Sequence, residues 1–147
     1  MKKNKALIVD LDGTLADIRV RLKHLQGKKK DWKSFHKSIE TDELHEWCRE
    51  IMIRFADEFK IIIVSGRVDD LKEETIQWLE KHEVPYDVRF MRRSKDHRPD
   101  TTMKLEIYEK EIKDKFQVLF VLEDRQKVVD MWRGEGLTVL QCAPGNF

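Results

Sequence analysis

The sequence lacks the features that mark membrane and secreted proteins. None of its apolar runs approaches the length that a membrane-spanning helix requires. The charged N-terminal residues lead into a short strand-like run, without the apolar segment and cleavage site of a secretory signal peptide. Internal repeats and low-complexity linkers are absent as well. We therefore expect a cytoplasmic protein without a membrane anchor, and we expect residues 1–147 to form a single domain.

Cysteine is scarce, and charge of one sign is not in excess. Cys48 and Cys142 lie far apart within apolar patterns, which predicts two reduced, buried thiols. The 29 basic and 28 acidic residues give a formal net charge of +1, so the total excludes little. The distribution is more informative, because residues 18–38 contain eight Lys or Arg and one Asp. The rest of the chain is therefore net acidic.

Short apolar runs alternate with segments of helical periodicity. The apolar runs are 5–10, 59–65, 86–91, 117–122 and 137–142, and the helical segments are 44–55, 69–82, 101–115 and 126–134. This alternation predicts an α/β fold, with a doubly wound, Rossmann-like parallel sheet of about five strands and helices on both faces. The basic segment 17–41 is weakly patterned and follows the first strand, where an insert or minimal cap would lie.

Carboxylates and hydroxyls follow three of the predicted strands. Asp10 and Asp12 come directly after the first strand, Ser65-Gly66-Arg67 after the second, and Glu123-Asp124 after the fourth. Ligands of doubly wound sheets bind beyond the carboxyl ends of the strands. Four carboxylates in one crevice repel one another unless a cation shares the site, and Mg²⁺ prefers such hard oxygen ligands. The alternatives are that Asp10 and Asp12 cap a turn and that the acids are solvated at the surface.

Lys104 lies near the start of the helical segment that follows Asp100. A cation in a first helical turn opposes the helix dipole. Asp100 is four residues earlier, so it could cap the helix or pair with Lys104. Lys104 is therefore either an exposed lysine tolerated by this pair or a cation that balances a phosphate beside the carboxylates.

These residues resemble a known family. Asp10-Leu-Asp-Gly-Thr14, Ser65, Lys104 and Glu123-Asp124 are similar, in order, to the four motifs of the haloacid-dehalogenase-like (HAD) phosphohydrolases. The similarity covers nearly the whole chain and is greatest to the phosphatase domain of phage-type polynucleotide kinase–phosphatases. The further residues that carry it are Val64-Ser-Gly-Arg67, Met91-Arg92, Asp100, Val128-Val-Asp-Met-Trp-Arg133 and the ending Gln141-Cys-Ala-Pro-Gly-Asn-Phe147.

The resemblance implies a mechanism. Asp10 would be the nucleophile that forms an aspartyl-phosphate, and Asp12 would act first as general acid and then as general base. Mg²⁺ would be held by Asp10, the backbone carbonyl of Asp12, and Asp124. Ser65 and Lys104 would hold the transferring phosphoryl group.

The resemblance also implies a set of substrate-binding residues, with one departure in the metal motif. Thr14, Gly66, Arg67 and Arg92 would bind the substrate phosphate, although Arg92 lies in a basic run and could simply be solvated. Relatives usually have two aspartates where this chain has Glu123-Asp124, so Glu123 could bind the metal through water or only orient Asp124. The sequence contains no Gly-x-x-x-x-Gly-Lys-[Ser/Thr] loop, so we predict no kinase activity.

The leaving alcohol is less well defined. The insert and a second basic stretch, 89–98, could flank the site as a track for a nucleic-acid backbone, with Trp32 or Phe35 stacking on a base. Alternatively, Trp32 and Phe35 anchor the insert to the core, and the lysine run is a solvated loop. Trp47, Trp78 and Trp132 fall within helical patterns and are predicted to be core or core-edge residues.

Three functions remain in competition. The first is a Mg²⁺-dependent phosphatase that removes 3′-phosphates from DNA or RNA ends, in the host cytoplasm if a phage encodes it. The second is a phosphatase for nucleoside monophosphates or another small ester. The third is a nucleic-acid-end binding module with a vestigial site, which the intact motifs disfavour. The sequence does not determine the oligomeric state.

Overall fold

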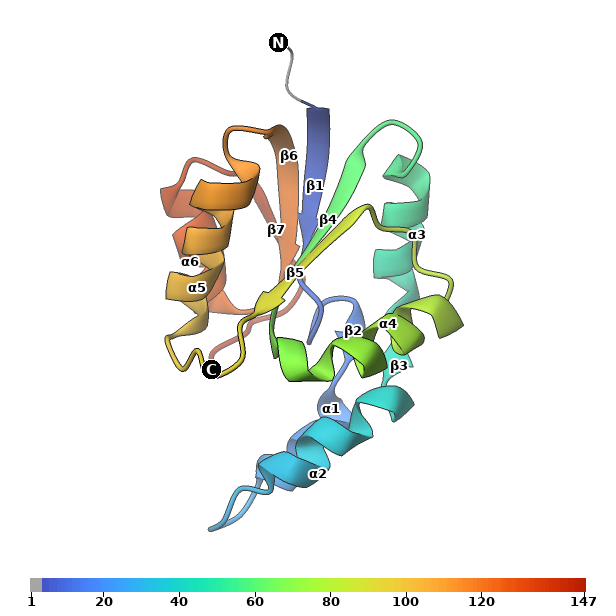
Figure 1. Cartoon of the computed structure of the whole chain (residues 1–147), viewed down its shortest axis with the longest axis vertical. Coiled ribbons are helices and arrows are strands. Elements are labelled where there is room, and N and C mark those ends of the chain that lie inside the picture. Colours follow the sequence, from blue (N-terminus) through green and yellow to red (C-terminus); the bar gives the residue numbers. More distant parts are fainter. Residues whose placement is uncertain (1–3) are drawn as a thin grey trace.

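A parallel sheet lies at the centre of the molecule (Figure 1). The computed structural model describes residues 4–147, apart from the side chain of His36. Five strands form the sheet in the order β5-β4-β1-β6-β7, and every neighbouring pair is parallel. Their bounds are β1 (Asn4–Val9), β4 (Lys60–Val68), β5 (Val88–Arg92), β6 (Phe116–Glu123) and β7 (Val139–Gln141). The predicted α/β class and the five predicted strands are confirmed, with ends that differ by a few residues.

Helices cover both faces of this sheet. The helices α3 (Glu46–Phe55) and α4 (Lys72–Lys81), the latter extended by η3 (Asp69–Leu71), lie on one side. The other side carries α5 (Asp100–Ile107), its continuation η4 (Tyr108–Ile112), and α6 (Gln126–Gly134) (Figure 1). All four predicted helical segments therefore form helices.

The strands are apolar throughout because each contributes side chains to two cores. In β1, Leu7 and Val9 pack toward α3 and α4, whereas Ala6 and Ile8 pack toward α5 and α6. Each fully buried Leu, Ile or Val side chain contributes about 1.5–3 kcal/mol. This double burial fixes the strand register and therefore the positions of the residues that follow each strand.

The basic segment 17–41 forms a helical insert beyond the carboxyl edge of the sheet (Figure 1). It comprises α1 (Arg19–Leu22), η1 (Lys23–Leu25), α2 (Trp32–Lys37) and η2 (Ser38–Thr41), and is closed by the short pair β2 (Ala16–Asp17) and β3 (Glu43–Leu44). The indole Nε1 of Trp78 donates to the carbonyl of Asp42 at 2.9 Å and ties the end of the insert to α4. The end of the insert is therefore docked on α4.

Two expectations about buried residues are wrong. Cys48 is buried, but Cys142 is exposed, and both are free thiols. Trp78 and Trp132 are buried, but the side chain of Trp47 is 42% exposed. Cys142 follows the short strand β7, and Trp47 lies in the first turn of α3, where apolar spacing does not reveal which side chains reach the sheet. Among the residues that the structure describes, no helix has the length and apolar character needed to cross a membrane.

Candidate active site

Three adjacent strands deliver the predicted site residues to one crevice. Asp10 follows β1, the central strand, and its amide donates to the carbonyl of Leu122 in β6 at 3.0 Å. Ser65 lies in β4 on one side of β1, and Glu123 ends β6 on the other. Because neighbouring parallel strands end at the same edge, the three residues lie at one edge of the sheet.

A tight turn after β1 places Asp10 and Asp12 on either side of the crevice. Gly13 adopts φ +85°, and a Cβ there would lie 2.2 Å from Asp124 Oδ2. The buried hydroxyl of Thr14 lies 3.2 Å from Asp10 Oδ2 and 3.3 Å from Asp124 Oδ1. The turn thus needs glycine for its backbone conformation and for the close approach of Asp124.

Lys104 is buried, so it is not the exposed lysine that its helix position allows. Its Nζ donates to Asp10 Oδ1 at 2.8 Å and to Glu123 Oε2 at 3.2 Å. The two carboxylates raise the pKa of Lys104 against the opposing effect of burial, so the amine stays charged. Glu123 Oε1 accepts from the backbone amides of Asp124 and Arg125, both at 3.2 Å.

Three carboxylates converge in the crevice at the end of β6. Oxygen atoms of Asp10, Glu123 and Asp124 all lie within 4.8 Å of one another, and the three residues are buried. Burial and the charge of Glu123 raise the pKa of Asp10 to about 7. Burial and the charge of Asp10 likewise raise the pKa of Asp124 to about 7. A divalent cation would offset the repulsion that disfavours ionisation of these carboxylates, and it prefers hard oxygen ligands of this kind. The cluster therefore fits a divalent cation.

Asp12 occupies a different electrostatic environment, between two arginines. Arg67 donates to both of its oxygens, and its Nη2 lies 2.6 Å from Oδ1. Arg21 of the insert also donates to Oδ1, at 2.6 Å. Although burial opposes it, these two guanidinium groups together hold the pKa of Asp12 well below its usual range. Asp12 is therefore ionised in this arrangement.

A bulge in β4 directs Arg67 toward Asp12. Ser65 pairs with Met91, but the next register pair joins Val68 to Arg92, so Gly66 and Arg67 leave the ladder. The amide of Arg67 donates to Ser65 Oγ at 3.1 Å, which orients the serine hydroxyl.

Sequence reasoning gave no site role to Arg21 or Asp42. Arg21 is almost fully buried and pairs with Asp42 at 2.7 and 2.8 Å through its Nε. Asp42 also lies 3.5 Å from Arg67. The two arginines and two aspartates form one network of ion pairs, and Asp12 has the most exposed side chain of the four. Arg19 lies in α1 as well, so no signal in the sequence distinguishes the buried Arg21 from its basic neighbours.

Asp100 neither pairs with Lys104 nor caps α5 through its side chain. Its Oδ1 pairs with Arg92, and its Oδ2 accepts from Arg125 at 2.8 Å. Arg92 also donates to the carbonyl of Gly66 at 2.9 Å. Arg92 is therefore held beside the site, not solvated as its basic surroundings allowed.

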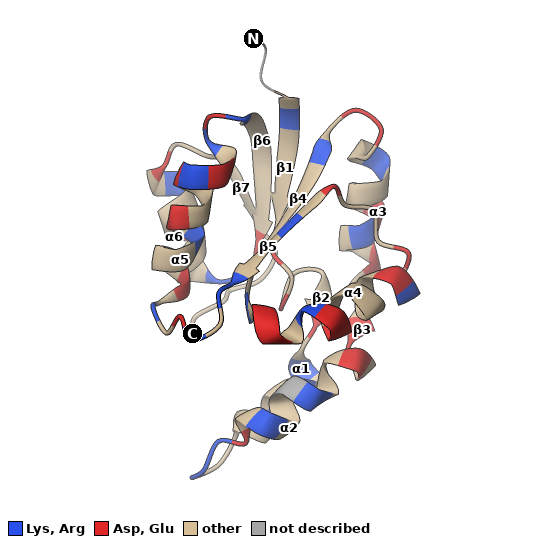
Figure 2. Ribbon diagram, viewed as in Figure 1, with Lys and Arg blue, Asp and Glu red and all other residues tan. Residues whose placement is uncertain are grey.

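A cavity of about 650 Å³ opens over these groups. Its walls include Asp10, Asp12 and Lys104 from the core, the insert residues Arg21, Leu25, Trp32 and Phe35, and, from the end of β5 and the loop after it, Arg92, Asp96, His97 and Arg98. The insert and the second basic stretch therefore flank one opening, as predicted. The loop that joins η1 to α2 lies at the distal tip of the insert, away from the sheet (Figure 2). Its sequence contains Lys28, Lys29 and Lys30.

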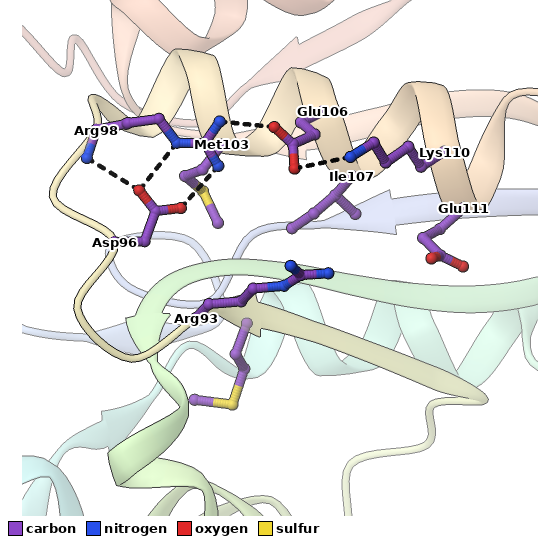
Figure 3. A pocket seen from close by; sticks show the side chains of 9 residues that line it. Arg93, Asp96, Arg98, Met103, Glu106, Ile107, Lys110 and Glu111 are labelled. Carbon is purple, nitrogen blue, oxygen red and sulfur yellow. Dashed lines mark hydrogen bonds and ion pairs between the residues drawn. The ribbon is translucent and has the colours of Figure 1, made fainter.

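Several cations near the opening are already paired. A small pocket of about 60 Å³ lies beside α5. Arg98 contacts Asp96 and Glu106 there, and Glu106 contacts Lys110 (Figure 3).

The aromatic ring of Phe35 packs against the guanidinium of Arg21, with 4.6 Å between Cζ and the ring centroid. Phe35 therefore supports Arg21, which accords with the alternative that Phe35 anchors the insert.

Comparison with known families gives a match along nearly the entire chain. The model of the family described as the polynucleotide kinase PNKP phosphatase domain matches residues 4–147. A protein of Autographa californica nuclear polyhedrosis virus, provisionally named a bifunctional polynucleotide kinase/RNA ligase, is 29% identical over 136 residues. That alignment covers 88% of this chain and 18% of the viral protein.

Solved structures agree with this match. A chain in the structure of a Pnkp1/Rnl/Hen1 complex superposes with a TM-score of 0.84 and 33% identity, covering 99% of this chain and 48% of that one. A hydrolase from Streptococcus pneumoniae TIGR4 shares the fold at a TM-score of 0.60 and 16% identity, covering 97% of this chain and 94% of that one. The chain thus spans less than half the length of the viral and Pnkp1 relatives.

Proposed function

Because the chain belongs to the family of the polynucleotide kinase PNKP phosphatase domain, and is a phosphatase, we propose that it removes 3′-phosphates from DNA or RNA ends. The observation that carries the proposal is the pairing of Asp10 with Lys104 at 2.8 Å, beside Asp12 and at the base of a cavity open to a polymer end. This arrangement offers an activated carboxylate, a cation for the phosphoryl group and a second carboxylate for proton transfer.

Asp10 is the proposed nucleophile. Lys104 and Thr14 contact its two oxygens and fix the carboxylate at the end of β1. Attack by an Asp10 oxygen on phosphorus forms an aspartyl-phosphate and breaks the bond to the 3′-oxygen of the substrate. Water then attacks the same phosphorus, which releases inorganic phosphate and restores Asp10.

Asp12 is proposed to move the protons. As an acid it would give its proton to the departing 3′-oxygen, and as a base it would take one from the hydrolytic water. The two arginines keep it ionised before substrate binds. A phosphate dianion competes for the same guanidinium groups, so we infer that substrate binding loosens them and lets Asp12 take up a proton.

Negative charge shifts among the phosphoryl oxygens during transfer, so hydrogen-bond donors must lie beside these oxygens. Lys104 supplies an ammonium, and Ser65 supplies a hydroxyl oriented by the amide of Arg67. Gly66, Arg67 and Arg92 line the same cavity. We assign these residues and Thr14 to phosphate binding and orientation.

The acidic cluster fits Mg²⁺. Asp10 and Asp124 are the proposed side-chain ligands, together with the backbone carbonyl of Asp12, and the ion would supply Lewis-acid polarisation of the phosphoryl group. Both oxygens of Glu123 are engaged by Lys104 and by backbone amides. We propose that Glu123 orients Lys104 and Asp124 and does not ligate the metal directly, because, unlike Asp10, it has one oxygen that already accepts from two backbone amides.

The test is phosphate release from 3′-phosphorylated DNA and RNA oligonucleotides and from nucleoside monophosphates, with and without Mg²⁺. We expect turnover of the oligonucleotides that requires Mg²⁺ and is abolished in Asp10→Asn. The affinity for oligonucleotides should fall steeply with salt, because basic side chains contact the backbone. Activity on nucleotides alone would indicate a small-ester phosphatase, and binding of ends without turnover would indicate a vestigial site.

A further inference from the structure

A second cavity lies beside the catalytic one. It has a volume of about 400 Å³ and is lined by residues that include Ile18, Leu22, His45, Trp47, Asp124 and Phe147. Ile18, Leu22, Asp124 and Phe147 also line the catalytic cavity. The two spaces are therefore contiguous, and they meet at a proposed metal ligand.

Exposed apolar side chains gather at this second cavity. Trp47 is 42% exposed, Phe147 is 60% exposed and Leu22 is 37% exposed. A tryptophan in the first turn of an amphipathic helix is expected to pack on the core, yet Trp47 lines a hollow at the surface. Apolar area left uncovered next to an active site favours a role in binding a ligand.

The cavity also has polar lining residues, which are held by hydrogen bonds. Arg19 donates through Nε and Nη2 to Asp17 at 2.5–3.0 Å. His45 places Nδ1 2.9 Å from the carbonyl of Thr14, and its Nε2 lies 3.8 Å from Asp17. The ring of His45 stacks on Trp47, with centroids 6.0 Å apart and an interplanar angle of 26°. The cavity thus combines an oriented aromatic surface with hydrogen-bonding groups of both polarities.

We propose that this cavity binds the base of the nucleotide next to the one that carries the 3′-phosphate. The inference rests on the proposed function and extends it, because it makes the substrate a strand of at least two nucleotides. A base has a flat π-face that stacks on an aromatic ring and a polar edge that accepts and donates hydrogen bonds. Trp47 matches the first property, and the largely exposed guanidinium of Arg19, which Asp17 orients, matches the second.

A basic side chain at the second cavity can bind the phosphate backbone of the strand. Arg19 is largely exposed and lies in the basic insert, so it can also approach a backbone phosphate. A phosphate in the catalytic cavity leaves its neighbouring nucleotide to exit past Ile18 and Leu22, which both cavities share. Trp32, the other exposed tryptophan, lines only the catalytic cavity.

The test compares kcat/KM for a dinucleotide and for a nucleoside, each carrying a 3′-phosphate, in Trp47→Ala, Trp47→Phe and Trp32→Ala. Base stacking on an aromatic side chain predicts that Trp47→Ala lowers the dinucleotide-to-nucleoside ratio by about 10-fold or more. Trp47→Phe keeps a ring and should restore most of the ratio. Ile53→Ala is the matched control, because Ile53 is 41% exposed on the same helix and does not line the cavity.

The outcomes separate this inference from the proposed function. No phosphate release from any oligonucleotide by the unaltered protein would overturn the proposed function. Oligonucleotide turnover with an unchanged ratio in Trp47→Ala would overturn only the base-binding inference, and so would a loss confined to Trp32→Ala. Because the measurement is a ratio within each variant, a partly unfolded preparation does not mimic the expected result.

Discussion

Arg21 Nη2 donates to Asp12 Oδ1 at 2.6 Å, so a residue of the insert contacts the proposed proton-transfer group. Arg21 is buried and reaches Asp42 on its other side. The insert therefore completes the electrostatic surroundings of Asp12, in addition to forming a wall of the cavity. A phosphate that draws Arg21 away would alter Asp12 and the packing of the insert together.

Replacing Arg21 tests this contact. Arg21→Ala leaves Asp42 buried with Arg67 as its remaining cationic partner, and breaking a buried pair in this way costs about 3–5 kcal/mol. Arg21→Ala also removes one of the two guanidinium groups that lower the pKa of Asp12, so the limb of the pH–rate profile that reports Asp12 should shift to higher pH. Denaturant unfolding and steady-state kinetics measure the two effects.

Arg54→Ala is the control for this substitution. Arg54 forms an exposed pair with Glu50 four residues away on α3, and such pairs contribute about 0.5 kcal/mol or less. Equal destabilisation by Arg21→Ala and Arg54→Ala would show that the buried network does not stabilise the fold.

Stability without Mg²⁺ should fall as pH rises toward neutrality. The pKa values of Asp10 and Asp124 are raised from 3.8 to about 7, so the folded state binds protons that the unfolded state has released. The stabilisation is complete below 3.8 and is lost as pH increases through about 7. With EDTA present, Tm should therefore be lower at about pH 8 than at about pH 5.

Added Mg²⁺ should reverse this loss, because an ion that binds only the folded state stabilises it. The increase in Tm should be larger at about pH 8 than at about pH 5, where protons compete for the same carboxylates. Asp124→Asn should reduce the difference. A Mg²⁺ effect that is independent of pH would contradict the assignment of these acids as ligands.

Gly13 provides a test of the metal-site geometry. In Gly13→Ala the new Cβ would meet Asp124 Oδ2 at 2.2 Å, so Asp124 must move. We expect a large increase in the Mg²⁺ concentration required for half-maximal activity. Gly136→Ala is a matched control, because Gly136 has φ +84° and a Cβ there meets nothing within 4 Å.

Both substitutions strain the backbone by about 1–2 kcal/mol, as a left-handed conformation does for residues with a Cβ. Gly13→Ala should therefore differ from Gly136→Ala in Mg²⁺ dependence more than in Tm. Similar Mg²⁺ dependence of activity in the two variants would show that Mg²⁺ binding does not depend on the position of Asp124.

Loss of charge at Glu123 and at Asp124 should weaken Mg²⁺ binding to different extents. Glu123→Gln retains an oxygen for the amides of Asp124 and Arg125, so it should weaken Mg²⁺ binding by about 10-fold, as loss of an outer partner does. Asp124→Asn removes a proposed ligand and should weaken it further. Titration of activity with Mg²⁺ measures both, and an equal or larger effect of Glu123→Gln would make Glu123 a direct ligand.

Most of the fold could be predicted from the sequence because its signals are local. The strands are apolar on both faces, as in β1 and β4, and the helices show their buried side by periodicity. The residues that follow the strands were recognisable because a parallel sheet brings the ends of neighbouring strands together. Asp10, Ser65 and Glu123 could be grouped in this way before their distances were known, whereas Lys104 was linked to them by the family resemblance.

Contacts between distant segments could not be predicted from these signals. Arg21 is one of eight basic residues between positions 18 and 38, and periodicity does not indicate which of them is buried. Asp100 has a lysine four residues away, yet it pairs with Arg92 and Arg125, which come from other elements. Trp47 has the spacing of a core residue but lines a surface cavity.

By itself, the sequence determined the order of strands and helices and the placement of Asp10 and Asp12 after the first strand. Backbone preference and burial of apolar side chains act over short stretches and are visible there. Only the tertiary structure decided that Asp10 pairs with Lys104 whereas Asp12 pairs with Arg21 and Arg67. Charge pairing depends on distances of a few ångströms between segments far apart in the chain, and packing of the whole molecule sets those distances.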